Sequence, residues 1–554
     1  MINKIILFGD FAGKDHDDFW ELNHVFFKTS ALLRLGYALR KEGFQVKQIH
    51  HCTSFNRKEL EHILDVFSQG EEILVCISSS FLSSVNRLDY AFHSDVSERD
   101  IQRVGGFWGK RAFDFLKNIG ILCRKNKFKV VMGGFDIQIW KFFDQNERKV
   151  WGFDALDIFV DYYISGDSHI PIMDICNGIE PKIKKTFTSV DGKKVKFVES
   201  VPIRHSDWDD YSFTPDPNDY VAPNESLVTQ IAGGCVFSCS FCTYQGLGKK
   251  PHQFCRSYES VKREIVFNWE NSKTSTYMII DNMINDYWEK IQYLIRIRDE
   301  TGIPLRWGAY ARLDTITTKE KARMFRDAGC AGVIFGIESM KKEVGPYIGK
   351  MTDGDKIKKH LEIFREAVGD TCMTSGSFIS GAPTETKEDL HKTFMWLNSD
   401  EGKELLDHYI FTPLFVEPWV NERNTINKAR AAARDPWQDY KFSDDMKIRM
   451  RGTDWISPWG TYDEFLKLAI EYSSVNNKSV KVEDAMSAAR GIFAMTVIHN
   501  VIDGGIDEFV SNVRTKTPFF HYNNRDMYKS NTKNLLDRYR KNTLGNYYGA
   551  FDDH

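Results

Sequence analysis

Three cysteines fall close together at Cys235, Cys239 and Cys242, within the stretch LVTQIAGGCVFSCSFCTYQGLG. Their spacing is C-x3-C-x2-C, and a β-prone run over residues 227–231 leads into them through two glycines. Three neighbouring thiolates can ligate three irons of a cubane cluster and leave the fourth iron without a protein ligand. An open metal position is a place for chemistry, so this loop is the first candidate for an active site. Glycine before the first cysteine lets the backbone turn tightly around a bulky cluster.

Two other interpretations of these cysteines stay open at this point. The first is a structural zinc site with His252 or Cys255 as the fourth ligand. Zinc sites usually pair one C-x2-4-C with a second pair further along the chain, which this sequence lacks. The second is a set of unrelated buried cysteines, since cysteine is a common core residue. The short spacing directly after a predicted strand favours the iron–sulfur interpretation.

The segment CVFSCSFC resembles the cluster motif of the radical S-adenosylmethionine (SAM) superfamily, and Phe241 before the third cysteine fits that pattern. The resemblance implies a [4Fe-4S] cluster held by Cys235, Cys239 and Cys242, with SAM chelating the open iron. It also implies reductive cleavage of SAM to a 5′-deoxyadenosyl radical. The electron would come from a reductant such as flavodoxin or ferredoxin.

Further signatures of the same family follow in order over about 200 residues: IIDNMIND, WGAYARLDTIT, FGIESM and FISGAPTET. The resemblance implies that Gly336, Glu338 and Ser339 contact the ribose and amino-acid parts of SAM. It further suggests Arg312 as a bidentate clamp for the SAM carboxylate. Each residue also has a plainer interpretation, because Glu338 can cap a helix and Arg312 can pair with Asp314 at the surface.

The adenine side of SAM has its own candidates. Gly381 and Pro383 match the family's glycine–proline turn, which the resemblance places beside adenine, and backbone near Phe241 and Tyr244 is a second candidate for that contact. The alternative is that Gly381 and Pro383 form only a turn.

The first part of the chain alternates predicted strands with helices, which is typical of an open parallel sheet. Ligands of such sheets bind at the carboxyl ends of the strands. The predicted strand ends carry Gly133, Gly134 and Gly166. The predicted strands cover residues 4–8, 44–49, 72–78, 127–132 and 161–164, and the predicted helices cover residues 29–42 and 111–123.

This order resembles the cobalamin-binding domain found ahead of many radical SAM domains, through the segments LLRLGYALRKEGFQV, VVMGGFD and DYYISGDSHIP. The resemblance implies a cobalamin site at Gly133, Gly134 and Gly166. The chain lacks the D-x-H-x-x-G motif that supplies a histidine to cobalt; His16 and His169 are the nearest candidates. A first domain that binds no cobalamin therefore remains an alternative.

The expected fold class is α/β. We predict a Rossmann-like (flavodoxin-like) parallel sheet domain over residues 1–180, a linker over 181–224, a partial (β/α)6 radical SAM barrel over 225–430 and a mainly helical region over 431–554. Barrels of this kind build their sites at the carboxyl ends of the strands. The tryptophan-rich part of the last region, which includes Trp455, is interpreted as core packing.

Composition excludes several other classes of protein. A net charge of −3 gives no overall attraction to nucleic acid or to an anionic membrane. No apolar run approaches the ~18 residues that span a bilayer. Ten cysteines without paired spacing favour the reducing cytoplasm over a disulfide framework. No cysteine follows Cys372, which argues against an auxiliary cluster in the last region.

The predicted function is therefore that of a radical SAM enzyme, with cobalamin-dependent C-methylation as the leading reaction and a small molecule or peptide of unknown identity as substrate. A cobalamin-independent oxidoreductase, cyclase or isomerase is the alternative enzyme. A non-enzymatic iron–sulfur or cobalamin sensor is the alternative from another class.

Overall fold

The computed structural model describes residues 1–10, 28–79, 110–134, 137, 154–200, 205–216, 218–237, 239–242, 252–414, 438–441, 455–475, 505–514 and 525–547. These residues form two compact units. The first unit contains the described residues up to 223 together with those from 526 onward, and the second contains the described residues from 224 to 525.

The first unit is built on a sheet with the strand order β2-β1-β3-β4-β5-β7-β6. The first five of these strands pair in parallel, and β6 pairs antiparallel with β7. The order 2-1-3-4-5 is that of flavodoxin-like sheets, so the predicted fold class is confirmed. The strands are β1 (Lys4–Phe8), β2 (Gln45–Ile49), β3 (Ile73–Ser78), β4 (Lys129–Gly133), β5 (Tyr162–Ser165), β6 (Ile183–Thr188) and β7 (Lys194–Glu199).

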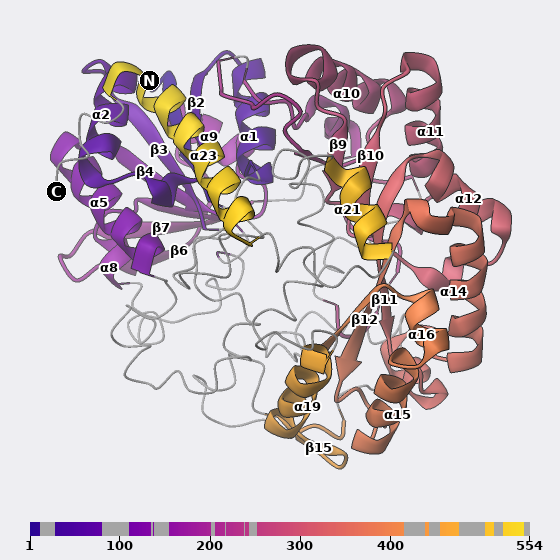
Figure 1. Cartoon of the computed structure of the whole chain (residues 1–554). Helices are drawn as coiled ribbons and strands as arrows, with labels where there is room; N and C mark the ends of the chain where they lie inside the picture. Colours follow the sequence, from indigo (N-terminus) through magenta and orange to yellow (C-terminus); the bar gives the residue numbers. More distant parts are fainter. Residues whose placement is uncertain are drawn as a thin grey trace. The chain divides into compact units, whose positions relative to one another are not determined.

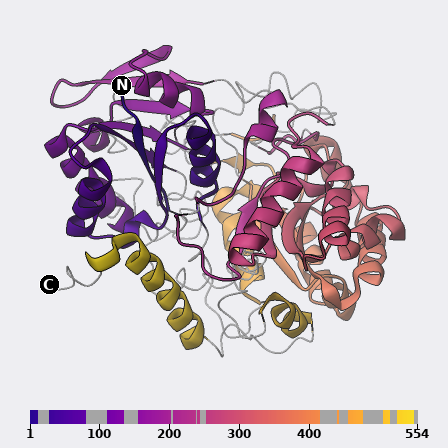
Figure 2. The ribbon, with the colours of Figure 1, turned by 90° about the horizontal axis from the view of Figure 1, so that it is seen from above.

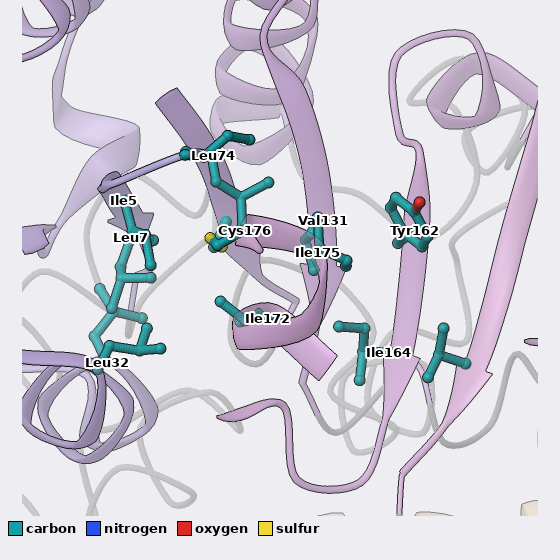
Figure 3. Close-up of a cluster of buried hydrophobic side chains, with 14 residues drawn as sticks. Ile5, Leu7, Leu32, Leu74, Val131, Tyr162, Ile164, Ile172, Ile175 and Cys176 are labelled. Carbon is teal, nitrogen blue, oxygen red and sulfur yellow. The ribbon is translucent and has the colours of Figure 1, made fainter. Parts of the chain in front are cut away.

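Helices cover this sheet because its central strands are apolar throughout and buried along their length, as in parallel sheets packed on both faces. Figure 3 shows Leu32 of the first helix and Ile172 of α9 among the strand side chains Leu7 and Ile164, which belong to one buried cluster. The helices are α1 (Ser30–Lys41), α2 (Arg57–Ser68), α5 (Lys110–Asn126), α8 (Asp154–Asp157), α9 (His169–Cys176) and α23 (Arg525–Leu544).

The C-terminal helix α23 packs on the first unit (Figures 1 and 2, yellow). The backbone N–H of His50 donates to the Tyr539 hydroxyl at 2.7 Å, and Arg540 pairs with Glu59 at 2.6 Å. Tyr539 is buried in this contact. The sequence-based division had grouped this helix with residues 431–514, whereas its contacts are with the N-terminal sheet and α2.

The segment predicted as a linker over residues 181–224 contains the β6–β7 hairpin, which extends the first sheet at one edge. Its turn runs over Asp191 and Gly192, and the Ser189 N–H donates to the Lys193 carbonyl at 2.9 Å. The hairpin pairs with β5 through β7, so this part of the chain belongs to the first unit.

The second unit is a parallel sheet with the order β13-β12-β11-β10-β9-β8, in which each strand pairs with its neighbours in chain order. Helices α10 to α16 lie along the outer side of these strands (Figure 1). This is the predicted partial (β/α)6 barrel. The strands are β8 (Leu227–Thr229), β9 (Thr276–Ile279), β10 (Arg306–Ala311), β11 (Cys330–Glu338), β12 (Met373–Ser380) and β13 (His408–Pro413).

The helices of the barrel are α10 (Tyr258–Ser272), α11 (Glu289–Thr301), α12 (Lys319–Asp327), α13 (Gly345–Ile348), α14 (Gly354–Val368), α15 (Lys387–Leu397) and α16 (Asp400–Leu405). Beyond them the second unit contains β14 (Ile456–Ser457), β15 (Gly460–Thr461), α19 (Tyr462–Val475) and α21 (Gly505–Arg514). Within the described part of the chain, none of the helices combines the length and the apolar character that a bilayer crossing requires.

Candidate functional site

The loop that carries the three cysteines is fixed at its start by the buried carboxylate of Asp281, which follows β9. Asp281 accepts the backbone N–H of Ile231 at 2.7 Å and that of Ala232 at 3.0 Å. Lys290 of α11 neutralises the carboxylate at 2.9 Å, with both side chains almost fully buried. A buried charge is retained only when it is paired and hydrogen-bonded, as it is here. The predicted strand-end signature IIDNMIND thus positions the cysteine loop from the neighbouring strand.

The chain returns from the cysteine loop through an antiparallel bridge between Ala232 and Cys255. The Gly233 N–H donates to the Phe254 carbonyl at 2.9 Å, and the Arg256 N–H donates to the Ile231 carbonyl at 2.8 Å. These bonds close the loop at its base. The glycine before the first cysteine, Gly234, has a φ of +71°, the left-handed conformation that the tight turn was expected to require.

The Arg256 side chain holds this return arm in place. It is buried, pairs with Glu264 of α10 at 2.8 Å and donates to the Gln230 carbonyl at 3.2 Å. Glu264 in turn accepts the Thr229 hydroxyl at 2.6 Å. Because both arms of the loop are tied to α10 and to the sheet, the thiols are carried by a pre-formed scaffold.

The three loop cysteines are half-exposed, whereas six other cysteines of the chain are buried. Burial raises the pKa of the Cys123 thiol to about 12 and that of the Cys52 thiol well above its usual range. Thiols held in that way stay protonated and do not bind metal. The thiols of the cysteine loop are less buried than these. A thiol must lose its proton to act as a metal ligand.

The zinc and the iron–sulfur interpretations require different arrangements of the ligands. Among the described residues, no three His, Cys, Asp or Glu side chains gather closely enough to hold one metal ion. A single zinc ion needs all its ligands around one point, whereas a cubane binds each cysteine through a different iron. Three accessible thiols are a suitable donor set for a cubane cluster.

Arg312, at the end of β10, lies beside these thiols. Its Nη1 is 3.4 Å from the Cys239 sulfur, and its Cζ lies 4.1 Å from the ring centroid of Phe237. The Asp314 carboxylate accepts two hydrogen bonds from the same guanidinium, one from Nε at 2.6 Å and one from Nη2 at 2.8 Å. Burial lowers the pKa of Arg312, but the Asp314 hydrogen bond and the neighbouring cysteines outweigh it, so this pKa is raised. The Arg312–Asp314 pair anticipated at the surface therefore exists, but it is buried in the site.

The end of β11 supplies a buried ion pair between Glu338 and Lys350, with 2.8 Å between Oε1 and Nζ. Glu338 has a φ of +72°, and conformations of this kind persist only where the surroundings enforce them. A Cβ atom on Gly336 would lie 2.5 Å from the Glu338 carboxylate and 2.8 Å from the Lys350 ammonium, so a larger residue there would make this ion pair shift. The Glu338 carboxylate pairs with the Lys350 ammonium instead of capping a helix. Of the predicted residues Gly336, Glu338 and Ser339, Glu338 thus forms an ion pair with Lys350, and Gly336 lies against that pair.

Ser339 links the end of β11 to the turn after β12. Its hydroxyl donates to the buried carboxylate of Glu385, and Lys341 donates to the Thr384 carbonyl at 2.7 Å. Burial raises the pKa of Glu385 to about 8, although the Ser339 hydrogen bond lowers it. The second carboxyl oxygen of Glu385 has no hydrogen-bond partner among the described residues.

The Gly381–Pro383 turn is packed from the C-terminal side of the second unit. A Cβ atom on Gly381, whose φ is +83°, would lie 2.6 Å from the Trp455 ring. The Tyr440 hydroxyl donates to the Gly381 carbonyl at 2.8 Å, and Trp455 is fully buried. Core packing, as predicted for the tryptophan-rich part, is what the structure shows for Trp455. Pro383 is buried in the same turn.

The strand ends of the barrel are joined by contacts from one to the next. Cys239 meets Arg312, Arg312 donates to the Gly349 carbonyl at 3.4 Å, and Ser240 donates to the Tyr347 carbonyl at 2.9 Å. Four predicted signatures, after β8, β10, β11 and β12, therefore meet at the carboxyl ends of these strands. Phe241 is half-buried in the cysteine loop, and Tyr244 lies outside the described residues.

In the first unit, backbone conformation and close packing account for the glycines at the predicted positions. Gly134 and Gly166 have φ values of +117° and +92°. A Cβ atom on Gly166 would lie 2.6 Å from the Ser200 carbonyl oxygen, and one on Gly133 would lie 3.1 Å from the Ser168 hydroxyl. Asp167, in the same segment, accepts the His169 N–H at 2.9 Å, and His16 lies outside the described residues.

Two buried serines, Ser78 and Ser79, lie at the end of β3, at the same edge of the first sheet. The hydroxyls of Ser78 and Ser79 have no hydrogen-bond partner among the described residues, and the Thr29 hydroxyl before α1 shares this property. Buried polar atoms are normally satisfied, so this edge is a candidate place for a polar ligand. The strand order reverses between β1 and β3 at this edge, which is where ligands of such sheets lie.

A family model named the Radical SAM superfamily matches residues 229–397, the stretch that contains the cysteine loop and the strand ends from β8 to β12. The chain contains a radical SAM domain. This domain implies a [4Fe-4S] cluster and SAM as cofactors, and it supports an enzymatic role.

Two curated proteins are similar to parts of this chain. An uncharacterised methyltransferase of Pyrococcus horikoshii is 29% identical over 168 residues, which is 30% of this chain and 35% of that protein. The anaerobic magnesium-protoporphyrin IX monomethyl ester cyclase of Cereibacter sphaeroides is 26% identical over 222 residues, 38% of this chain and 34% of that protein. The chain thus spans about a third of the length of each relative.

Among solved structures, the chain resembles the radical SAM methyltransferase TsrM from Kitasatospora setae, solved with cobalamin and a [4Fe-4S] cluster bound. The TM-score is 0.55 at 15% identity, covering 97% of this chain and 100% of that one. At this identity the likeness concerns the fold, and it extends over both units.

Several site residues were missed by the sequence analysis. Lys350, Lys290 and Glu385 are charged side chains whose partners in the site, Glu338, Asp281 and Ser339, are not their neighbours in the sequence. Asp281 was noticed only as a strand end. A usable signal was its position directly after an apolar run, where parallel barrels place functional side chains.

The raised pKa of Glu385 predicts how stability changes with pH. A carboxyl whose pKa is about 8 in the folded protein and near 4.3 when unfolded favours folding when protonated. Its contribution is therefore complete below about pH 4.3 and is lost as the pH rises through 8. We expect Glu385→Gln, which mimics the neutral form, to gain stability relative to wild type between pH 5 and 8, by up to about 1.4 kcal/mol per pH unit.

Urea unfolding at several pH values would measure this difference. Glu388→Gln, in the helix α15 that follows Glu385, is the control, because Glu388 is exposed and pairs with Lys392 in a surface contact. Curves for Glu385→Gln and wild type that stay parallel across this pH range would contradict the prediction.

Proposed function

We propose that this radical SAM enzyme is a cobalamin-dependent C-methyltransferase that transfers a methyl group to an unactivated carbon. The observation that carries the proposal is the set of three unsatisfied buried hydroxyls at the switch point of the flavodoxin-like sheet, in a chain that also has a radical SAM domain. The fold likeness to TsrM over both units supports the same interpretation.

In the second unit, we propose that Cys235, Cys239 and Cys242 hold the cluster. When bound, the cluster and SAM supply radical chemistry, and cobalamin supplies methyl transfer. The half-exposed thiols above a loop tied down at both ends support this assignment. The chain contributes accessible thiolates on a rigid base, which limits where the cofactors and the substrate can lie.

We propose that the SAM ribose and amino-acid groups lie against Gly336, Glu338 and Ser339, with Lys350 beside them. Paired charges that are already desolvated interact strongly with ligand ammonium or carboxylate groups, because little water competes. The adenine is assigned to Gly381, Pro383 and the backbone near Phe241 and Tyr244. The buried turn at Gly381 supports that half of the assignment.

In the first unit, we propose that Ser78, Ser79 and Thr29 donate or accept hydrogen bonds to polar groups of cobalamin, beside Gly133, Gly134 and Gly166. The residues fit such a ligand because their hydroxyls are buried and lack partners among the described residues. The unit that would hold this ligand extends past the predicted boundary at residue 180, because the β6–β7 hairpin extends its sheet.

A cyclase is the second candidate, favoured by the similarity to the magnesium-protoporphyrin ester cyclase. Such an enzyme would use the same radical SAM domain without transferring a methyl group to its product. We further propose that the chain works in the reducing cytoplasm with a flavodoxin- or ferredoxin-type reductant, consistent with ten free cysteines.

The test is anaerobic purification from cells supplied with cobalamin, followed by analysis of corrinoid, iron and sulfide. About one corrinoid and four irons per chain, with a labelled methyl group of SAM recovered in product, are expected for the methyltransferase. Four irons without corrinoid, even after reconstitution, would overturn it in favour of the cyclase class. A protein that binds the cofactors but forms no 5′-deoxyadenosine from SAM would be a sensor.

A further inference from the structure

We propose that Arg312 donates a charge-assisted hydrogen bond to the Cys239 sulfur and thereby raises the reduction potential of the cluster. The inference rests on the proposed function, because it requires a cluster on these cysteines. It assigns Arg312 a different role from the carboxylate clamp that the sequence suggested. Arg312 is here a positioning and tuning residue, acting through a cluster ligand.

The contact is direct and poorly hydrated. Arg312 Nη1 lies 3.4 Å from the Cys239 sulfur, a distance suited to an N–H···S bond with a large acceptor atom. Arg312 is only 6% exposed, so few water molecules compete for its donors. In such surroundings a cation interacts with nearby charge more strongly than it would in water.

The orientation of the guanidinium is fixed on its other sides. Asp314 engages Nε and Nη2, the Gly349 carbonyl accepts a further bond from Nη2, and Phe237 stacks against the plane of the group. Asn285 locks the Arg312 backbone, accepting its N–H and donating to its carbonyl, each at 2.8 Å. Nη1 is the nitrogen left facing the thiol.

The same arrangement argues against a carboxylate clamp. A bidentate clamp needs two parallel N–H donors on one edge of the guanidinium. Asp314 already takes the edge formed by Nε and Nη2 in this way. The other edge, formed by Nη1 and Nη2, faces the Cys239 sulfur and the Gly349 carbonyl. A ligand carboxylate on either edge would have to displace a partner from its own chain.

The sign of the effect follows from charge. Reduction adds one electron from the reductant to the cluster, and the added negative charge spreads over iron and sulfur. A fixed cation and a donor at one ligand sulfur stabilise the reduced state more than the oxidised state. Hydrogen bonds to cluster sulfurs are among the determinants of reduction potential.

The experiment compares reconstituted wild type with Arg312→Gln, Arg312→Lys and Arg326→Gln. Arg326 is the matched control, because it is a barrel arginine in an exposed pair with Asp327. Iron and sulfide are counted first. Midpoint potentials are then measured without SAM by dithionite titration followed by electron paramagnetic resonance.

For Arg312→Gln we expect the ratio of reduced to oxidised cluster at a fixed solution potential to fall about tenfold, a shift of about −59 mV for one electron. Arg312→Lys retains the positive charge but not the planar guanidinium. Its midpoint potential should lie between those of Arg312→Gln and wild type. If Arg312→Gln binds no iron, a lowered midpoint potential in Arg312→Lys would support the proposal instead. Arg326→Gln should match wild type.

The inference is overturned if the Arg312 variants hold four irons at the wild-type potential. A wild-type chain that binds no iron overturns the proposed function and this inference with it, and iron analysis reveals that before any titration. A purely structural role for Arg312 would change stability or loading while leaving the potential of the loaded cluster unchanged.

Discussion

A Cys239→Ala variant should purify and reconstitute with only background iron, and its formation of 5′-deoxyadenosine from SAM should fall to the level without enzyme. Two remaining thiolates leave two irons of a cubane without protein ligands, so the cluster is lost to solvent and chelators. The fold should survive, because Cys239 is half-exposed and the loop is tied down by bonds outside it. Iron and sulfide analysis, with product quantification, measures both effects.

Cys255→Ala is the control for this result. Cys255 is also half-exposed and lies on the return arm of the same loop, paired through its backbone with Ala232. We expect it to retain four irons per chain and to cleave SAM. Equal metal loss in both variants, or zinc in place of iron, would instead support the zinc site with Cys255 as fourth ligand.

The second large effect is expected for Lys350→Met. Removing the ammonium leaves Glu338 as a buried carboxylate without its partner, which costs about 3–5 kcal/mol of folding free energy for pairs of this kind. The strained φ of +72° at Glu338 adds to the expected loss, because the pair is one of the contacts that enforce it. Denaturant unfolding of the purified chain would measure the change.

Two further variants test whether the pair itself is responsible. Lys358→Met removes a lysine that pairs with Glu401 in a partly exposed contact, and should cost at most about 1 kcal/mol. Lys350→Met combined with Glu338→Gln should recover part of the stability, because no unpaired charge is then buried. An equal loss in both single lysine variants would contradict the assignment.

Much of the fold could be predicted because parallel strands are short apolar runs bounded by turns. Residues 4–8 were predicted and observed as the same strand. The β6–β7 hairpin was missed although Asp191-Gly192 stands between two alternating runs, a known hairpin signal. Helix α2 was missed although Asn56 and Glu59 form its capping box. In both cases the signal was local and was not used.

The place of α23 could not be read from sequence. An amphipathic pattern shows that a helix has an apolar face, but not which surface covers it. Its position depends on Tyr539 and Arg540 meeting His50 and Glu59, nearly the whole chain away. The site divides in the same way: cysteines and strand-end signatures were visible, whereas the partners of Glu338, Asp281 and Ser339 required the fold.

The shared membership of α23 and the N-terminal sheet in one unit has a consequence for biosynthesis. Residues 224–525, a stretch of 302 residues, are made after the sheet and before this helix. At about 5–20 residues per second, the ribosome takes roughly 15–60 s over that stretch. During that interval the nascent sheet has no α23 over His50 and Glu59. The first unit thus reaches its final contacts only after the radical SAM barrel has been synthesised, although it begins the chain.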